Sequence, residues 1–513
     1  MCLEVFEAFG ESELSIMGLH PVPITEFLVS LAMDTSKEES LRLHAIHTLT
    51  AIVSLKRKLF SKPNVMDILV KSLWNIIESE LNAPNNRESI KEFCFWQLGK
   101  CVPEKVLTST IQAFQALSGN LPTSKLVTSV FEMSRASGSA GPSAVALIAL
   151  GAIVEDCSEF ITQNCLQAAM QAMLAGISNE NPLIRLSGFF ALGEICQFIP
   201  MPSLIKGHID TILAAVGDAL GKISLSGPVS EEVEMVDSVV LNCLDELFEN
   251  LPSENIEASF DGLLNRIVEI ATQSPSFLTR QIAYTVLHQI CEKYGNLTAP
   301  RANQIADFLS SQITNGCTLS PGMENVTSLQ QEEIRLDAIH TLTALVEGLG
   351  KKMHKQLLTT RPALFDQCLH VCAMFLQHPG GIPAEYKSKV YYLIAELSPF
   401  VPERLAPELP NLTKFLFESA KTSPMKSDSD GAANGSNGDS AMDDGDEDDH
   451  DDMDLKNDVV DEVASALTCL GHISVAVGPA FIPYFNETFE TVWLLSNFPS
   501  SYVFRFFDSF FEI

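Results

Sequence analysis

Residues 39–53 read Glu39-Ser-Leu-Arg-Leu-His-Ala-Ile-His-Thr-Leu-Thr-Ala-Ile-Val53, and residues 332–346 repeat them as Glu332-Glu-Ile-Arg-Leu-Asp-Ala-Ile-His-Thr-Leu-Thr-Ala-Leu-Val346. Eleven of the fifteen positions are identical. Apolar residues recur in both copies at intervals of three and four, which is the period of an amphipathic helix. The offset of 293 residues divides into seven units of about 42 residues, and a repeat of that size predicts a chain of stacked helix pairs.

Other segments follow the same pattern of outer helix, turn and inner helix. The clearest has a helix over 164–177, the turn Ser178-Asn-Glu-Asn-Pro182 and a helix from Leu183 to Ile195. Pro182 suits a helix start, where its missing N–H would be unpaired anyway. A period of about 40 to 47 residues is that of HEAT or armadillo repeats. We therefore predict an all-α fold, a right-handed superhelical solenoid of about ten HEAT-type pairs that offers an extended binding surface.

An arginine stands early in several of the expected inner helices. The four are Arg42, Arg185, Arg280 and Arg335. A role in binding a ligand is one interpretation, but recurrence at the same place in each unit favours a structural role, in ladders of hydrogen bonds between repeats. Gly188 and Ala191, further along one of these helices, are small enough to allow close helix contact.

The composition is that of an intracellular protein. The twelve cysteines are scattered through apolar segments, with no Cys-x-x-Cys motif, which favours free thiols in a reducing compartment. The chain opens Met1-Cys-Leu-Glu, which lacks the basic start of a signal peptide. The longest uncharged apolar run, from Ser143 to Val154, is too short to span a bilayer, so we expect no membrane insertion.

The net charge of −32 is the second strong feature of the chain. Residues 427–458 hold thirteen acids and one base, so about −12 lies in that segment and about −20 over the rest. Such a field repels nucleic acid and attracts basic proteins, of which histones and ribosomal proteins are examples. The alternative is that the charge only keeps a large apolar solenoid in solution.

Composition also divides the chain. We expect a solenoid over 1–421, an acidic disordered loop over 422–458 inserted within one repeat, the continuing repeat over 459–495 and an atypical aromatic-rich end over 496–513. Solenoids need polar capping repeats, and neither end of this chain reads as one. We therefore expect the chain to be a fragment or an incomplete gene product.

Two groups of acids are candidates for binding basic proteins. On or near expected inner helices, without a neighbouring base in the sequence, are Glu194, Asp237, Asp245 and Glu246, which could equally face solvent. The loop candidates are Asp443, Asp444, Asp446, Glu447, Asp448, Asp449, Asp451, Asp452 and Asp454. The loop would act either as a movable counter-charge or as a plain solvated linker.

No catalytic constellation is present in the sequence. It lacks a phosphate-binding Gly-x-x-x-x-Gly-Lys loop, a Gly-x-Ser-x-Gly elbow and a His-Glu-x-x-His zinc helix. His44 and His47 are three apart on one expected helix, but two ligands without a third make a poor metal site. We expect no enzymatic activity, no metal and no cofactor.

Three features together resemble the karyopherin-beta family of nuclear import receptors (the importin-beta superfamily), and within it the importin-4 type. They are the helix pairs, typified by Asn181-Pro-Leu-Ile-Arg-Leu-Ser-Gly-Phe-Phe-Ala-Leu-Gly193, the acid-rich insertion in a late repeat, and the helix, Phe-x-Pro-Tyr turn and helix over 466–490. The resemblance covers residues 1 to about 495. The family's N-terminal region, which supplies much of its contact with the GTPase Ran, has no counterpart here, and residues 496–513 depart from the family pattern.

The resemblance implies a monomeric receptor that shuttles between cytoplasm and nucleus. It would wrap basic cargo on its concave surface, release it to Ran-GTP and pass the pore by binding Phe-Gly nucleoporins. We expect weak Ran binding by this chain alone. The alternative is a HEAT-repeat scaffold or histone chaperone without transport, whose cargo binding Ran-GTP would leave unchanged.

Overall fold

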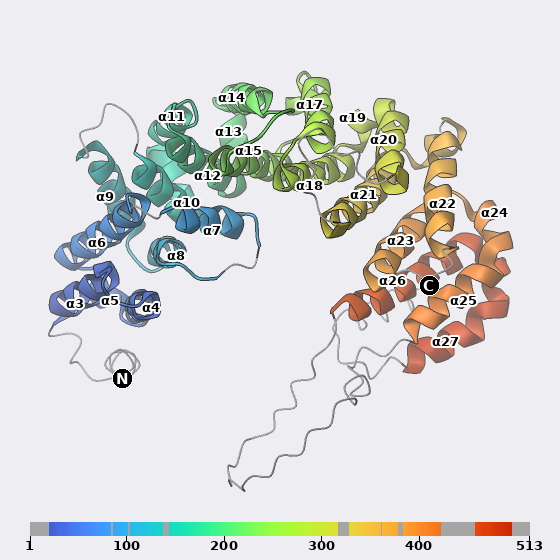
Figure 1. Cartoon of the computed structure of the whole chain (residues 1–513), viewed down its shortest axis with the longest axis horizontal. Helices are drawn as coiled ribbons and strands as arrows, with labels where there is room; N and C mark the ends of the chain where they lie inside the picture. The colour runs from blue at the N-terminus through green and yellow to red at the C-terminus, as the bar shows by residue number, and fades with distance from the viewer. Residues whose placement is uncertain are drawn as a thin grey trace, which may run out of the picture. The chain divides into compact units, whose positions relative to one another are not determined.

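The structure is a computed structural model. It describes residues 20–83, 86–100, 103–136, 143–315, 328–360, 362–377, 383–421 and 457–494, and these form helices and turns without a strand. The helices divide into two compact units, the first before residue 290 and the second from Ile290 onward (Figure 1). The all-α prediction is confirmed, and the predicted domain bounds stay predictions.

In the first unit, outer and inner helices alternate along the chain. The outer helices are α3 (Pro21–Met33), α6 (Pro63–Leu81), α9 (Thr123–Ala136), α11 (Leu166–Ile177), α14 (Ile209–Lys222) and α17 (Phe260–Gln273). The inner helices are α4 (Glu39–Leu55), α8 (Val106–Ser118), α10 (Ala144–Asn164), α12 (Pro182–Phe198), α15 (Glu231–Asn250) and α18 (Phe277–Lys293), the last of which runs through the unit boundary. Short helices join them: α5 (Arg57–Phe60), α13 (Met201–Ile205) and α16 (Ser253–Ile256).

The second unit continues the alternation. Its helices are α19 (Gly295–Thr298), α20 (Ala302–Asn315), α21 (Ser328–Thr360), α22 (Pro362–Leu376), α23 (Ala384–Leu397), α24 (Pro402–Leu405), α25 (Leu409–Ala420), α26 (Asn457–Val477) and α27 (Phe485–Leu494), with 3-10 turns η1 (Ala299–Arg301), η2 (Ala406–Glu408) and η4 (Gly478–Tyr484). The candidate acids of residues 443–454, and residues 496–513, lie outside the described part of the chain.

Local sequence explains where the inner helices start and how closely they pack. Ser143, Asn181 and Ser230 each accept a hydrogen bond from a backbone N–H in the first turn of α10, α12 and α15, which satisfies one of the donors left free at a helix start. Within α12, a Cβ at Gly188 would lie 2.8 Å from the backbone nitrogen of Ile177. The predicted close contact at this glycine is therefore confirmed.

The duplicated segment lies on two inner helices, α4 and α21. Six steps separate them along the inner row (α4, α8, α10, α12, α15, α18, α21), so the prediction of seven units was wrong and the mean unit is about 49 residues. The first step is the outlier, because α8 starts 67 residues after α4, whereas α10 and α12 each start 38 residues after the preceding inner helix. The excess contains an additional helix, α7 (Asn86–Gln97), between α6 and α8.

The repeat arginines bond mainly within their own helix pair. Nε of Arg42 donates to the carbonyl of Ala32 (2.7 Å), and Nε of Arg280 to that of Ala271 (2.9 Å), both at the end of the preceding outer helix. Nη1 of Arg185 donates to the carbonyls of Asn179 and Glu180 in the turn (3.0 and 2.7 Å). They thus satisfy carbonyls that a helix end leaves free.

Two of the arginines are seen to interact with the next helix pair. Arg42 reaches Glu80 of α6, and the charge of Arg185 acts on Asp237 of α15. Arg335 pairs with Glu332, one turn earlier on its own helix (2.9 Å). For the other arginines the ladder between repeats stays a prediction.

One apolar segment, Val459–Trp493, which contains α26, η4 and α27, meets a length and composition test for a membrane span, a feature that the sequence analysis did not identify. Its packing is that of a core helix: α26 lies against α23 and α25, and its buried Glu462 pairs with Lys387 of α23 (2.7 Å). A buried carboxylate with a partner on a neighbouring helix is suited to a protein core. The segment is thus explained as an inner helix and its continuation.

Candidate acidic pocket

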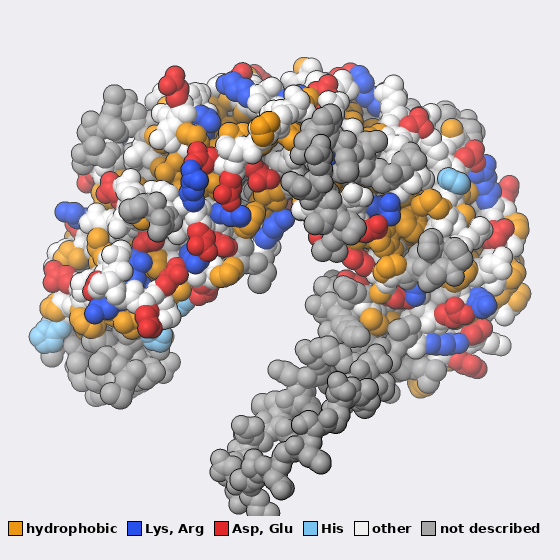
Figure 2. Space-filling model, in the orientation of Figure 1, with side chains coloured by type: hydrophobic (Ala, Val, Ile, Leu, Met, Phe, Trp, Pro, Cys, Tyr) orange, Lys and Arg blue, Asp and Glu red, His pale blue; other side chains and the backbone are white. Residues whose placement is uncertain are grey.

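Helix α15 is the most acidic of the inner helices in the first unit. Its twenty residues include seven acids and no Lys, Arg or His. Three of the four inner-helix candidates lie on it, at Asp237, Asp245 and Glu246, and the fourth, Glu194, lies on the adjacent inner helix α12. Figure 2 shows acidic and basic side chains next to one another over this part of the unit. The prediction that these acids lie on inner helices is correct.

Two of the candidates, Glu194 and Glu246, line one pocket of about 300 Å³. Helices α12 and α15 approach closely there, since a Cβ at Gly193 would lie 3.7 Å from the Cα of Cys243. The lining combines acids, amides and aromatic rings from five helices: Trp96 and Gln97 of α7, Gln115 of α8, Glu155 of α10, Phe189, Phe190, Glu194, Gln197 and Phe198 of α12, and Val239, Asn242 and Glu246 of α15.

The pocket makes ionisation of its acids costly. Burial, together with the charges of Glu246 and Glu155, raises the pKa of Glu194 to about 8. Burial likewise raises the pKa of Glu246 to about 7, with Asp245 and Glu249 adding to the shift. Carboxylates that repel one another in a poorly hydrated site are stabilised by a cation placed among them. The pocket therefore has the charge and size to take a lysine or arginine side chain.

Polar atoms in this region lack protein partners. Among the described residues, Oε2 of Glu246 and both amide atoms of Gln97 are buried without a hydrogen bond, although the two residues line the same pocket. Asp245, next along α15, has Oδ1 in the same situation, and burial raises its pKa to about 6. Buried polar groups are usually paired, so these atoms are suited to a donor from outside the chain.

Asp237 differs from the other three candidates and corrects the prediction. It is buried, and Arg185 and Arg266 both exert a favourable charge on it, although burial dominates and raises its pKa to about 7. The sequence suggested no nearby base because both arginines are distant in the chain, on α12 and α17. Asp237 therefore belongs to the packing between helix pairs and does not line the pocket.

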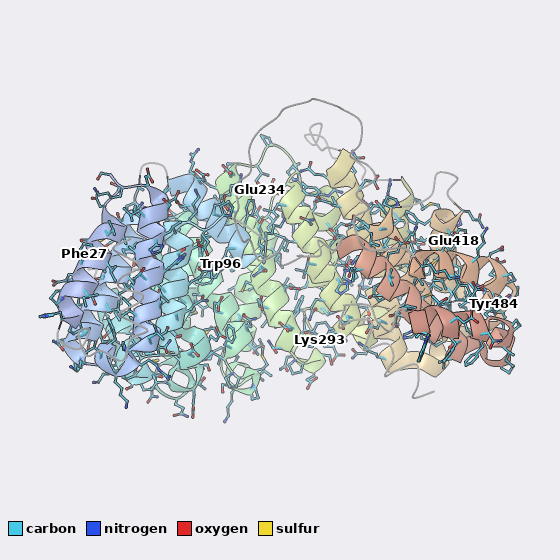
Figure 3. All side chains as sticks on the ribbon, turned by 90° about the horizontal axis from the view of Figure 1, so that it is seen from below. Phe27, Trp96, Glu234, Lys293, Glu418 and Tyr484 are labelled. Carbon is cyan, nitrogen blue, oxygen red and sulfur yellow. The ribbon has the colours of Figure 1, made fainter. Side chains whose placement is uncertain are left out.

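Helix α7 forms one wall of the pocket and covers part of the inner helices. It contacts α6, α8 and α15, and Phe93, which is fully buried, packs edge to face on Phe190 of α12 (ring centroids 5.2 Å apart). Trp96 of α7 and Glu234 of α15, both labelled in Figure 3, lie in the same part of the unit. Helix α7 thus packs against inner helices without belonging to any helix pair.

Sequence reasoning missed α7, Glu155 and the pocket amides. The available signal was the mixture of basic and aromatic residues over 86–100, which fits neither helix of a repeat. For the described residues, no group of three or more His, Cys, Asp and Glu could hold a metal ion, and the nine described cysteines are free.

Comparisons with known proteins show which proteins the whole chain is similar to. No family model matches the chain. The chain is 22% identical to human importin-4 over 520 residues, which cover 97% of this chain and 45% of that protein. It is also 22% identical over 499 residues to a probable importin subunit beta-4 of Schizosaccharomyces pombe, covering 95% and 42%. Kap121p bound to Pho4p has the same fold, with a TM-score of 0.70 at 15% identity over 98% of this chain and 46% of that one.

The chain is thus similar to importins, which are karyopherin-beta proteins, over nearly its whole length. Kap121p bound to Nup53p is a second structural neighbour, with a TM-score of 0.69 at 16% identity over 98% of this chain and 46% of that one. The chain spans less than half the length of these relatives. The relatives bear the names of transport receptors and not of enzymes, in agreement with the expectation of no catalytic activity.

Proposed function

We propose that this chain is part of a nuclear transport receptor of the karyopherin-beta family and binds basic cargo, such as histones or ribosomal proteins, on the acidic inner-helix face of its first unit. The observation that carries the proposal is the pocket in which Glu194 and Glu246 meet beside Trp96 and the amide of Gln97. A lysine or arginine side chain would supply the missing positive charge and hydrogen-bond donors, and its aliphatic stem would lie on the aromatic rings.

A structural neighbour of this chain, Kap121p, has been solved with other proteins bound to it. Kap121p has been solved bound to Pho4p, to Nup53p and to the extreme C-terminus of Cdc14p, and also as a mutant in which two aspartates and one glutamate are replaced by lysine. Cargo release by Ran-GTP, binding to Phe-Gly nucleoporins and shuttling between cytoplasm and nucleus belong to the same proposal. The acids of residues 443–454 would add a second source of negative charge for the cargo.

The test is binding of a histone H3–H4 preparation to the chain across a salt series. The variant Glu194→Gln/Glu246→Gln keeps side-chain size and removes two charges from the pocket. We expect it to weaken binding by about tenfold or more, since buried charged pairs count for much more than exposed ones. A matched control, Asp210→Asn/Asp218→Asn, removes two exposed charges from the outer helix α14 and should change affinity by less than about twofold.

Two further arms separate the alternatives. Deleting residues 443–454 tests the acid-rich segment, and a large loss on deletion with none in the pocket variant would move the cargo site to that segment. Adding Ran-GTP to the complex tests transport. Release of histone supports the receptor, whereas unchanged binding supports the scaffold or histone chaperone.

A further inference from the structure

The basic side chains of α7 already occupy part of the acidic face to which cargo is proposed to bind. Nζ of Lys91 lies 2.8 Å from Oε1 of Glu231, and Nη2 of Arg87 lies 3.2 Å from Oε1 of Glu232, both acids being in the first turn of α15. Lys100, just after α7, donates to Oε1 of Gln281 on α18 (3.0 Å). The contacts reach from the segment between α6 and α8 to inner helices three and four pairs further along.

Two kinds of contact hold α7 in place, and they differ in how easily they break. Phe93 is fully buried and packs on Phe190, so undocking the whole helix would expose a large apolar ring. The charged contacts lie at the surface: the side chains of Arg87 and Lys91 are 76% and 42% exposed, and those of Glu232 and Glu231 are 51% and 46% exposed. Exposed ion pairs contribute little to stability. The aromatic contact therefore anchors α7, and the charged contacts can exchange with another cation.

Arg87 and Lys91 are four residues apart on one helix face, so α7 presents two positive charges one turn apart beside an aromatic anchor. This is the chemistry of the basic cargo proposed above, supplied by the chain itself. We propose that α7 is an internal competitor: Arg87 and Lys91 occupy Glu231 and Glu232, and a basic ligand gains these acids only by displacing them. The inference rests on the proposed function, because it concerns access to the same face.

The occupied acids lie on the same helix as one of the pocket acids. Glu231 and Glu232 are at the start of α15, and Glu246, at the other end of the same helix, lines the pocket whose wall includes Trp96 of α7. A basic segment that placed one side chain in the pocket and ran along α15 would meet Arg87 and Lys91 next. Their positive charges would repel it, which would favour cargo with enough basic residues to replace both.

The test compares four forms of the chain in binding to H3–H4 at low salt: the unchanged protein, Arg87→Ala/Lys91→Ala, that double variant with Glu231→Gln/Glu232→Gln added, and Glu194→Gln/Glu246→Gln. We expect Arg87→Ala/Lys91→Ala to bind about threefold to tenfold more tightly, because the two freed carboxylates become available. Adding Glu231→Gln/Glu232→Gln should abolish the gain. The control Lys222→Ala/Arg404→Ala removes two positive charges that pair with Asp218 and Asp366, neither of which is on α15, and should leave affinity within about twofold.

The outcomes distinguish this inference from the function on which it rests. Unchanged or weaker binding by Arg87→Ala/Lys91→Ala, together with a loss in the pocket variant, would overturn the competitor role of α7 and leave the proposed function standing. A gain that persists after Glu231→Gln/Glu232→Gln would also overturn it, since the gain would then come from net charge. If the pocket variant binds normally while the gain appears and depends on Glu231 and Glu232, the pocket assignment fails and the competitor role stands.

Discussion

The two ends of α15 carry the same kind of residue in opposite environments. At its start, Glu231 is exposed and paired with Lys91, which holds the pKa of Glu231 below its usual range. Near its end, Glu246 is buried in the pocket and burial raises its pKa to about 7. Both differences follow from neighbours on other helices. The comparison teaches that an acidic inner helix is not a uniform binding surface: one end is neutralised by ion pairs within the chain, and the other holds a buried carboxyl group whose ionisation is costly.

The largest expected effect comes from disturbing helix α7. Its basic side chains pair with acids at the start of α15, and its Trp96 lines the pocket near the other end. Phe93→Ala should lower the free energy of unfolding of the first unit by about 3 to 5 kcal/mol, because a fully buried ring is lost from between α7 and α12. Chemical denaturation followed by circular dichroism measures it. Phe95→Ala, on the more exposed side of α7, is the matched control and should cost much less. Equal losses for the two variants would mean that α7 is not anchored through Phe93.

The next effect concerns the pocket end and depends on pH. The pKa of Glu194 is about 8 in the folded chain, against an ordinary value of 4.5. Because the folded value is the higher one, the contribution of this group to stability is complete below pH 4.5 and is lost as pH rises through 8. Glu194→Gln does not titrate, so we expect it to be equal in stability to the unchanged chain near pH 4.5, more stable by roughly 2 kcal/mol at pH 6, and more stable still at pH 9.

Thermal unfolding at several pH values measures this difference, with Asp210→Asn on the exposed face of α14 as a control that should show none. A Glu194→Gln variant that is less stable than the unchanged chain at pH 9 would contradict the burial of charge in the pocket.

Binding of a basic ligand should also depend on pH through the pocket end. Glu194 and Glu246, with pKa values of about 8 and 7, must lose their protons to attract a lysine side chain. The affinity of H3–H4 should therefore fall by about tenfold as the pH is lowered from 8 to 6. Fluorescence anisotropy at constant ionic strength measures it. The affinity of Glu231→Gln/Glu232→Gln should depend on pH in the same way as that of the unchanged chain. An affinity of the unchanged chain that does not change with pH would contradict binding in the pocket.

The smallest effect is expected at the exposed end of α15. Glu231→Gln breaks the pair with Lys91, and since both side chains are nearly half exposed, stability should fall by less than about 1 kcal/mol and the difference should vanish at high salt. Denaturation with and without 0.5 M added salt, roughly enough to screen a surface pair, measures it. A loss as large as that of Phe93→Ala would show that the ion pairs, and not the aromatic contact, hold α7.

The sequence predicted the helix pairs because their periodicity and turns are local properties. Three features were predicted in this way: the duplicated segment, the start of α12 at Pro182 and the close contact at Gly188. The number of units was not, because the offset of 293 residues also contains α7 and short connecting helices, which a mean period hides. Periodicity reports the regular parts of a solenoid and averages over its insertions.

The site was predicted in part for the same reason. Glu194 and Glu246 could be chosen as inner-helix acids, but their meeting in one pocket depends on the close approach of α12 and α15 at Gly193. Asp237 was chosen on equal grounds and turned out to lie near Arg185 and Arg266, which the chain brings in from other helices. Long-range neighbours decide whether an acid is paired, and a single sequence does not contain them.

The most direct test of the central claim, that a basic side chain binds between Glu194 and Glu246, is the number of protons exchanged when a lysine-rich peptide binds at pH 7. Titration calorimetry in buffers of different ionisation enthalpy measures it. Because the pKa values of about 8 and 7 leave Glu194 mostly protonated and Glu246 about half protonated at pH 7, the account predicts net proton release on binding, and none for Glu194→Gln/Glu246→Gln. Tight binding by the unchanged chain without proton release would contradict it.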